Sequence, residues 1–137
     1  MGDRANVFVV EDEGNNKEEG VYLYTHWGGS ELPKTVARAL DRGRERWGDT
    51  PYLTRIIFSE MIKREVEGLT GYGISTKQIY GDDDRIITIY PERKELYILS
   101  SGRYYSFEEF IRAQPDWSSE LGEDGRDNKI KINKKEN

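Results

Sequence analysis

The segment 22–29 concentrates residue types that recognise ligands. It holds the single histidine, His26, and one of the three tryptophans, Trp27, and it ends in the pair Gly28 and Gly29. Side-chain alternation predicts a strand here, followed directly by a capped helix. A strand-to-helix turn exposes backbone N–H groups, which suit an anionic or polar ligand. The sequence therefore predicts a ligand site at this turn but does not name a reaction.

Two polar residues near the start of the chain are expected beside this turn. If strands over 5–10 and 21–27 pair as a hairpin, Arg4 and Asn6 lie next to the end of the second strand. Arginine is the natural bidentate partner of a phosphate or carboxylate. A structural ion pair between Asp3 and Arg4 is an alternative interpretation of the same residues.

A third segment has a tyrosine between two glycines, Gly71 and Gly73. Tyr72 could stack on a planar ligand, or the glycines could simply soften a strand entry. Tyr22 and Tyr24 add aromatic rings on one face of the expected second strand. We expect a ligand to contact nine residues: Arg4, Asn6, Tyr24, His26, Trp27, Gly28, Gly29, Tyr72 and Gly73.

The motifs of common cofactor and metal sites are missing from the sequence. The chain has no cysteine and one histidine, which excludes thiolate and multi-histidine metal sites. Neither the phosphate-loop spacing nor the dinucleotide-binding glycine pattern occurs. We therefore expect no cofactor and no metal. His26 could act as a general base if folding brings Asp3 or Asp49 beside it, but a histidine bonded at a strand end is the simpler interpretation.

Three arginines recur at helical spacing in the segment that follows the glycine pair. Arg38, Arg42 and Arg46 lie four residues apart and line one face of the expected helix. Asp41 and Glu45 are interleaved with them. This mixture of charges favours a solvated surface.

Composition restricts the class of protein and its partners. A chain of 137 residues is one domain by length, and its formal net charge of −5 argues against nucleic acid as a partner. No apolar run approaches the length of about 20 residues needed to span a bilayer, so we expect a cytosolic protein without a membrane partner. The segment 11–19 carries five acids and one lysine. It is a candidate surface for a basic protein partner.

Hydrophobic periodicity and turn residues predict an α+β fold. The expected order is ββ-αα-βββ-α, a mostly antiparallel five-stranded sheet with helices on one face. Ser106 and Glu109 match the capping-box spacing at the last helix. We expect a single domain over 1–117 and a disordered charged tail over 118–137. The expected strands are 5–10, 21–27, 71–80, 85–90 and 95–100, and the expected helices are 31–47, 50–68 and 107–113.

Four stretches together resemble a group of small bacterial and phage proteins to which no activity is assigned. They are GDRAN at 2–6, YTHWGG at 24–29, RIIFSEM at 55–61 and GYGIS at 71–75. The resemblance covers residues 2–113 and implies a compact single-domain protein. It transfers no catalytic role. It suggests bacterial or phage defence or counter-defence, with the protein sequestering a signal molecule.

The residues favour binding over catalysis. Our first hypothesis is a non-catalytic binding protein for a small nucleotide-like ligand, anionic or aromatic. The second is an inhibitor or interaction protein whose acidic surface meets a basic protein. The third is a small hydrolase with His26 as general base.

Overall fold

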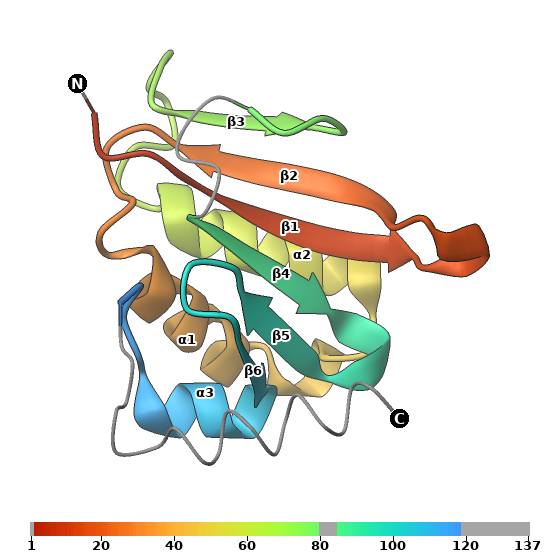
Figure 1. Cartoon of the computed structure of the whole chain (residues 1–137). Helices are drawn as coiled ribbons and strands as arrows, with labels where there is room; N and C mark the ends of the chain where they lie inside the picture. Colours follow the sequence, from red (N-terminus) through yellow and green to blue (C-terminus); the bar gives the residue numbers. More distant parts are fainter. Residues whose placement is uncertain (1, 80–84, 119–137) are drawn as a thin grey trace.

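The computed structural model describes residues 2–79 and 85–118, and it has an α+β fold (Figure 1). The described part contains one six-stranded mixed sheet and three α-helices. From residue 119 onward, the expected tail lies outside the described residues. The strands are β1 (Ala5–Asp12), β2 (Glu19–Thr25), β3 (Tyr72–Ser75), β4 (Ile86–Tyr90), β5 (Glu95–Ile98) and β6 (Arg103–Ser106), and the helices are α1 (Leu32–Arg42), α2 (Thr50–Ile62) and α3 (Phe107–Ala113).

The sheet has the strand order β3-β2-β1-β4-β5-β6, with β1 near its centre. β1 pairs antiparallel with β2 and parallel with β4, and the remaining neighbours are antiparallel. The parallel pair arises because the chain passes through both long helices and β3 before it returns beside β1. The α+β class is thus confirmed, but the expected five strands are six and one pairing is parallel.

Two helices are shorter than their apolar periodicity predicts. α1 ends at Arg42 instead of residue 47, because Gly43 is its C-cap and a 3-10 turn, Arg44–Arg46, follows. A Cβ at Gly43 would lie 3.3 Å from side-chain atoms of Ile56, so the glycine lets α2 pass close by. α2 ends at Ile62 instead of residue 68. The next eight residues are exposed, so they have no apolar face that a longer helix would bury.

The sixth strand, β6, is the element that the sequence prediction missed. It is four residues long and lies between the turn at Ser101 and Gly102 and the cap of α3. Its antiparallel pairing with β5, in which Tyr104 lies opposite Tyr97, decides its conformation. A strand of four residues with polar residues at both ends is too short to show a hydrophobic periodicity in the sequence.

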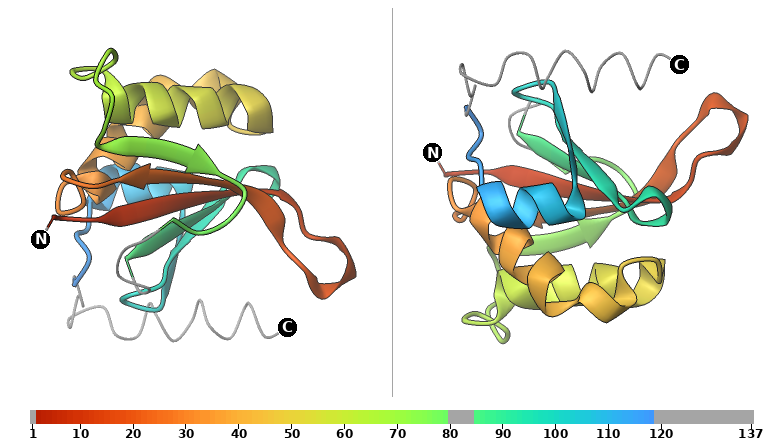
Figure 2. Two further views of the ribbon diagram at one scale, coloured as in Figure 1. Left: turned by 90° about the horizontal axis from the view of Figure 1, so that it is seen from above. Right: turned by 90° about the horizontal axis from the view of Figure 1, so that it is seen from below.

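The main core lies between the sheet and all three helices (Figure 2). The helix-facing residues of each strand are buried there, and the opposite, helix-free face carries a smaller aromatic cluster in which Phe8 stacks on Tyr22 at 4.3 Å. The core includes Val7, Val9, Leu23, Leu32, Val36, Leu40, Leu53, Ile57, Ile87, Ile89, Leu96, Ile98, Phe107 and Phe110.

Within 2–79 and 85–118, no helix has the length and apolar character to cross a bilayer.

The capping box at α3 is confirmed. Ser106 Oγ accepts a bond from the Glu109 amide at 3.0 Å, and Glu109 Oε1 accepts one from the Ser106 amide at 2.9 Å. Two amides at the start of the helix therefore have partners. The box fixes the point at which β6 turns into α3.

Replacing Ser106 by alanine should lower the free energy of unfolding by about 0.5–2 kcal/mol, because one helix amide loses its acceptor. Urea denaturation measures the change. Glu109→Gln is the matched control, since it keeps a side-chain oxygen for the Ser106 amide. An unchanged midpoint in Ser106→Ala would contradict a stabilising cap.

Candidate ligand-binding site

The turn between β2 and α1 is held against the start of the chain by backbone hydrogen bonds. The Asp3 amide donates to the His26 carbonyl at 2.7 Å, and the Gly29 amide donates to the Asp3 carbonyl at 2.7 Å. The Gly28 amide donates to Thr25 Oγ1 at 3.0 Å. Both glycine amides thus have acceptors inside the protein. The prediction that they are presented to a ligand is not met in this conformation.

The Asp3 side chain ties the same turn to β4. Its carboxylate accepts the amide and hydroxyl of Ser30 at 2.9 and 3.0 Å and the Arg85 guanidinium at 2.6 Å. Desolvation alone would raise the pKa of Asp3, but these hydrogen bonds and the charge of Arg85 hold it below its ordinary value. Asp3 therefore pairs with Arg85 and not with its neighbour Arg4.

His26 has an aromatic environment. Its Nδ1 lies 2.8 Å from Tyr24 Oη, and its ring meets Trp27 edge-on at 4.3 Å. The Asp3 carboxylate already accepts hydrogen bonds from Ser30 and Arg85. Asp49 caps α2 by accepting the Tyr52 amide. Among the described residues, no carboxylate forms an ion pair with His26. Neither Asp3 nor Asp49, the acids that a general-base role of His26 would require, is therefore paired with it.

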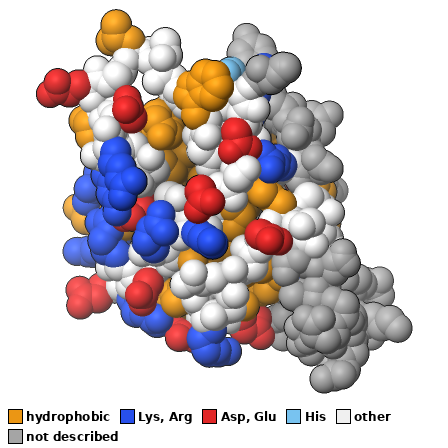
Figure 3. Space-filling view, turned by 90° about the vertical axis from the view of Figure 1, so that its left-hand side faces the viewer, with side chains coloured by type: hydrophobic (Ala, Val, Ile, Leu, Met, Phe, Trp, Pro, Cys, Tyr) orange, Lys and Arg blue, Asp and Glu red, His pale blue; other side chains and the backbone are white. Residues whose placement is uncertain are grey.

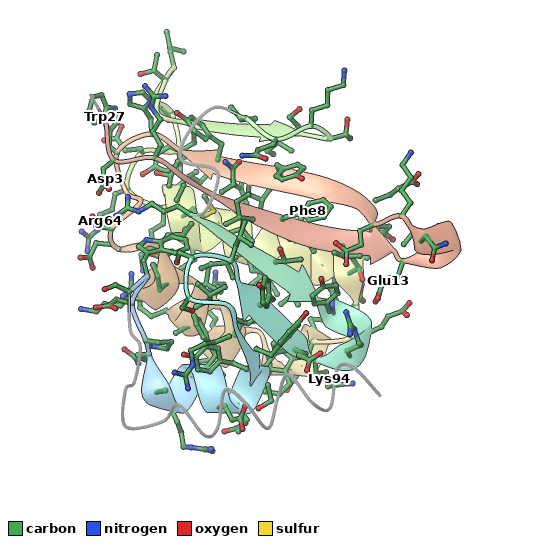
Figure 4. All side chains as sticks on the ribbon, viewed as in Figure 1. Asp3, Phe8, Glu13, Trp27, Arg64 and Lys94 are labelled. Carbon is green, nitrogen blue, oxygen red and sulfur yellow. The ribbon has the colours of Figure 1, made fainter. Side chains whose placement is uncertain are left out.

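The nine predicted residues are divided between different parts of the sheet. Asn6 lies opposite Tyr24, as the hairpin predicts, and both face the helix-free side with Gly73. Asn6 is fully buried and donates to the Ile79 carbonyl at 2.9 Å. Trp27, in contrast, is 65% exposed at the end of the strand (Figure 4). The predicted residues therefore do not surround one cavity.

A pocket of about 570 Å³ lies on the helix side of this region (Figure 3). It is bounded by the end of β2, the start of α1, the end of α2 and β3. Gly28 and Tyr72 line it, and Trp27 lies between lining residues in the chain. Arg4 and Asn6 do not line it, and Asn6 faces the opposite, helix-free side of the sheet. The lining residues are Thr25, Gly28, Glu31, Leu32, Thr35, Arg38, Glu60, Met61, Lys63, Arg64 and Tyr72.

A nearly buried carboxylate organises the cations in and beside the pocket. Glu60, with a side chain 5% exposed, accepts bonds from Lys63 at 2.6 Å, Arg42 at 3.2 Å and Arg38 at 3.4 Å. Desolvation would raise the pKa of Glu60, but the hydrogen bonds and the charge of Lys63 outweigh it and keep the pKa low. Arg38 and Arg42 thus join α1 to α2, where a solvated face was expected. Arg46 contacts Asp49 at 3.6 Å.

The pocket wall is more positive than the protein as a whole. Three cations line it, Arg38, Lys63 and Arg64, against the carboxylates of Glu31 and Glu60. Within the described part of the chain, Arg64 has no hydrogen-bond or ion-pair partner. Its guanidinium is therefore available to a ligand anion. Figure 3 shows lysine and arginine side chains gathered on this face.

Sequence reasoning assigned none of these charged residues of the two helices to the candidate site. The four-residue spacing of Arg38 and Arg42 and the three-residue spacing of Glu60 and Lys63 place each pair on one helix face. These spacings were available in the sequence. That the two faces meet was not, because it depends on how α1 packs on α2.

The acidic segment belongs to the long β1–β2 hairpin, which projects beyond the sheet (Figure 1). Two of its acids have internal partners. Glu18 accepts a bond from Tyr90 at 2.7 Å, and Glu13 forms an ion pair with Arg93 at 3.3 Å. Burial and the nearby Glu18 raise the pKa of the Tyr90 phenol. These two acids therefore hold the hairpin to β4 and to the turn that follows β4.

Comparison with known proteins does not assign the chain to a family. No family model, no curated protein and no solved structure matches the chain. Among residues 2–79 and 85–118, no group of three or more histidine, aspartate or glutamate side chains could hold a metal ion.

Gly29→Ala should destabilise the protein by about 1–3 kcal/mol. A Cβ at this position would lie 2.5 Å from the Asp3 carbonyl oxygen. Relieving this clash requires a shift of the backbone, which costs more free energy than a side-chain rotation. Gly28→Ala is the matched control, since its Cβ would meet Thr25 Oγ1 at 3.1 Å and ask for a smaller adjustment. Thermal or urea unfolding measures both. Equal stability of Gly29→Ala and wild type would contradict the close packing of this turn.

Glu60→Gln should lower the free energy of unfolding at pH 7 by about 1–3 kcal/mol, because three cations lose their shared anion. The folded-state pKa of Glu60 lies below the ordinary value of 4.5. The contribution of Glu60 is therefore complete above that pH and is lost as the pH falls through the folded-state pKa. Urea denaturation between pH 7 and pH 3 should show the wild type and the variant converging. A constant difference would contradict this ionised role.

Proposed function

We propose that the protein binds, without chemically altering it, a small ligand that joins an anionic group to a planar ring, as a nucleotide does. The observation that carries this proposal is the pocket of about 570 Å³ that is lined both by cations and by Tyr72. That volume falls within the range of small-ligand sites. The local excess of positive charge is notable in a chain whose net charge is −5.

The cations are arranged in a way that supports anion binding. Glu60 orients Arg38 and Lys63, and their side chains remain about half exposed, with relative exposures of 54% and 52%. Arg64 adds a guanidinium with no partner in the described part. Arginine offers paired donors that match a phosphate or carboxylate. The start of α1 contributes a further partial positive charge to the same wall.

Apolar and aromatic residues complete the site for a ring. The side chains of Leu32 and Met61 are buried beneath the pocket, and Tyr72 is half-buried at its side. The exposed Trp27 lies beside Gly71, where a Cβ would be 3.7 Å from the indole Cδ1. Tyr72 can stack on a planar group, and the indole can cover it from the rim.

The chemistry of the lining favours binding over catalysis. Glu60 is a poor base because its pKa is low and three cations use its oxygens. His26 is not among the lining residues, and its Nδ1 is engaged with Tyr24 Oη. Sequestration of a signal molecule, as the resemblance to bacterial and phage proteins suggests, requires no more than such a site.

Isothermal titration calorimetry tests the proposal with nucleoside mono- and diphosphates, cyclic dinucleotides and pyrophosphate. Arg64→Gln should weaken binding of the best ligand about tenfold or more, because a charge-assisted hydrogen bond contributes about 1.5–3 kcal/mol. Arg64 supports no other described residue, so the variant should keep its fold. Arg112→Gln on α3 is the matched control and should bind as the wild type does.

A second variant separates the ring from the anion. Tyr72→Leu should reduce affinity for a ring-bearing ligand and leave pyrophosphate binding unchanged, since it removes the stacking surface alone. Absence of heat with every compound, or wild-type affinity in Arg64→Gln, would contradict the proposed site.

A further inference from the structure

The outer edge of β3 has backbone groups without partners in the sheet. β3 is the last strand in the order, and its other side pairs with β2. The His26 amide donates to the Gly71 carbonyl, which makes these two residues a hydrogen-bonded pair. Because hydrogen-bonded and open pairs alternate along an antiparallel ladder, the amides and carbonyls of Tyr72 and Ile74 point outward.

Nothing in β3 itself protects this edge. Natural edge strands carry charges, prolines or bulges that prevent pairing with other chains. β3 has the sequence Tyr-Gly-Ile-Ser and regular pairing with β2 over all four residues. Its Ile74 side chain is 59% exposed, which is unusual for a large apolar residue in a strand.

An apolar groove of about 350 Å³ lies beside the same edge. It separates Ile74 and the buried Leu23 from α2, which runs alongside β3 (Figure 2). Its hydroxyl groups are occupied, since Thr54 donates to the Thr50 carbonyl and Ser59 to the Ile56 carbonyl. The groove is lined by Leu23, Pro51, Thr54, Arg55, Phe58, Ser59, Ile62 and Ile74.

The groove lies where a further strand would place its side chains. A chain paired with β3 points alternate residues toward α2, and the residue opposite Ile74 enters the groove. Arg55 is exposed on the α2 side and has no ion-pair partner in the described part. It is the one charged residue among those that line the groove. The occupant is therefore apolar at one position and acidic at a neighbouring position on the same face.

We propose that β3 and α2 form a docking site for an extended segment of a partner protein, which adds a seventh strand to the sheet. The segment places a bulky apolar side chain in the groove and an acidic side chain, two residues away, against Arg55. Backbone bonds to Tyr72 and Ile74 supply affinity, and the groove and the arginine supply selectivity. The groove shares no lining residue with the anion pocket, although Tyr72 offers its backbone to the proposed edge and its side chain to the pocket.

The dimensions favour a short segment over a second copy of this chain. The edge is four residues long and presents the outward backbone groups of only Tyr72 and Ile74, which is little for the roughly 1,200 Å² that a stable interface buries. A second copy would also place its own positively charged Arg55 near the first, whereas the charge of Arg55 favours an acidic partner residue. A peptide with one apolar and one acidic side chain matches both size and charge.

Selection from a displayed library of random linear nonapeptides on the full chain tests the site. Enriched peptides should share an acid two positions from a bulky apolar residue. With a synthetic peptide in excess, hydrogen exchange of the Tyr72 and Ile74 amides should slow at least tenfold. The amides of Gly73 and Ser75, which already bond to β2, should not change. Failure to enrich any such sequence, or protection of other amides instead, overturns the proposal.

Two variants sharpen the test. Ile74→Pro removes an outward amide without breaking a bond to β2, and edge strands tolerate proline; affinity should fall at least tenfold while circular dichroism stays unchanged. If this variant unfolds, Arg55→Glu decides, because it should select basic peptides in place of acidic ones. Arg112→Glu carries the same charge change on α3 and should select as the wild type does. Wild-type affinity in a folded Ile74→Pro overturns the proposal, as does a dimer in sedimentation equilibrium that this variant abolishes.

Discussion

The carboxylate of Asp3 is the acceptor on which the placement of the pocket between α1, α2 and β3 depends. It receives Ser30 from the turn before α1 and Arg85 from the start of β4, so three distant parts of the chain meet at one group. Trp117 adds its indole N–H to the Gly29 carbonyl in the same turn at 2.7 Å. The first residue of α1 is thereby fixed relative to the sheet. The pocket wall that α1 carries is fixed with it.

Local signals in the sequence were sufficient for most individual elements. The capping box at Ser106 acts within a few residues and occurs where expected, and α2 begins at the expected residue, Thr50. What failed depended on contacts across the chain. β6 exists because β5 lies beside it, and α1 stops at Gly43 because α2 passes close to that glycine. A periodicity carries no information about such neighbours.

The site could be predicted as a region but not as a set of residues. The hairpin register brings the start of β1 beside the end of β2, as expected, and Trp27 is exposed there. Alternation along β2 nevertheless divides the chosen residues between two faces of the sheet, and the pocket lies on one of them. Its charge comes from Glu60 and the cations around it. Their meeting depends on the packing of two helices, which a single sequence does not specify.

The parallel pairing of β1 with β4 has a consequence for how the protein is made. Asn6 lies opposite Ile86, so the centre of the sheet joins the first strand of the chain to one encoded far downstream. On the ribosome, the β1–β2 hairpin emerges early, while the other edge of β1 has no neighbour until β4 has been synthesised. Val7 and Val9 lie in that strand, and they are fully buried in the finished fold. Closing such a long loop is entropically costly and slows folding. The nascent chain thus passes through an interval in which one edge of this apolar strand is accessible to chaperones.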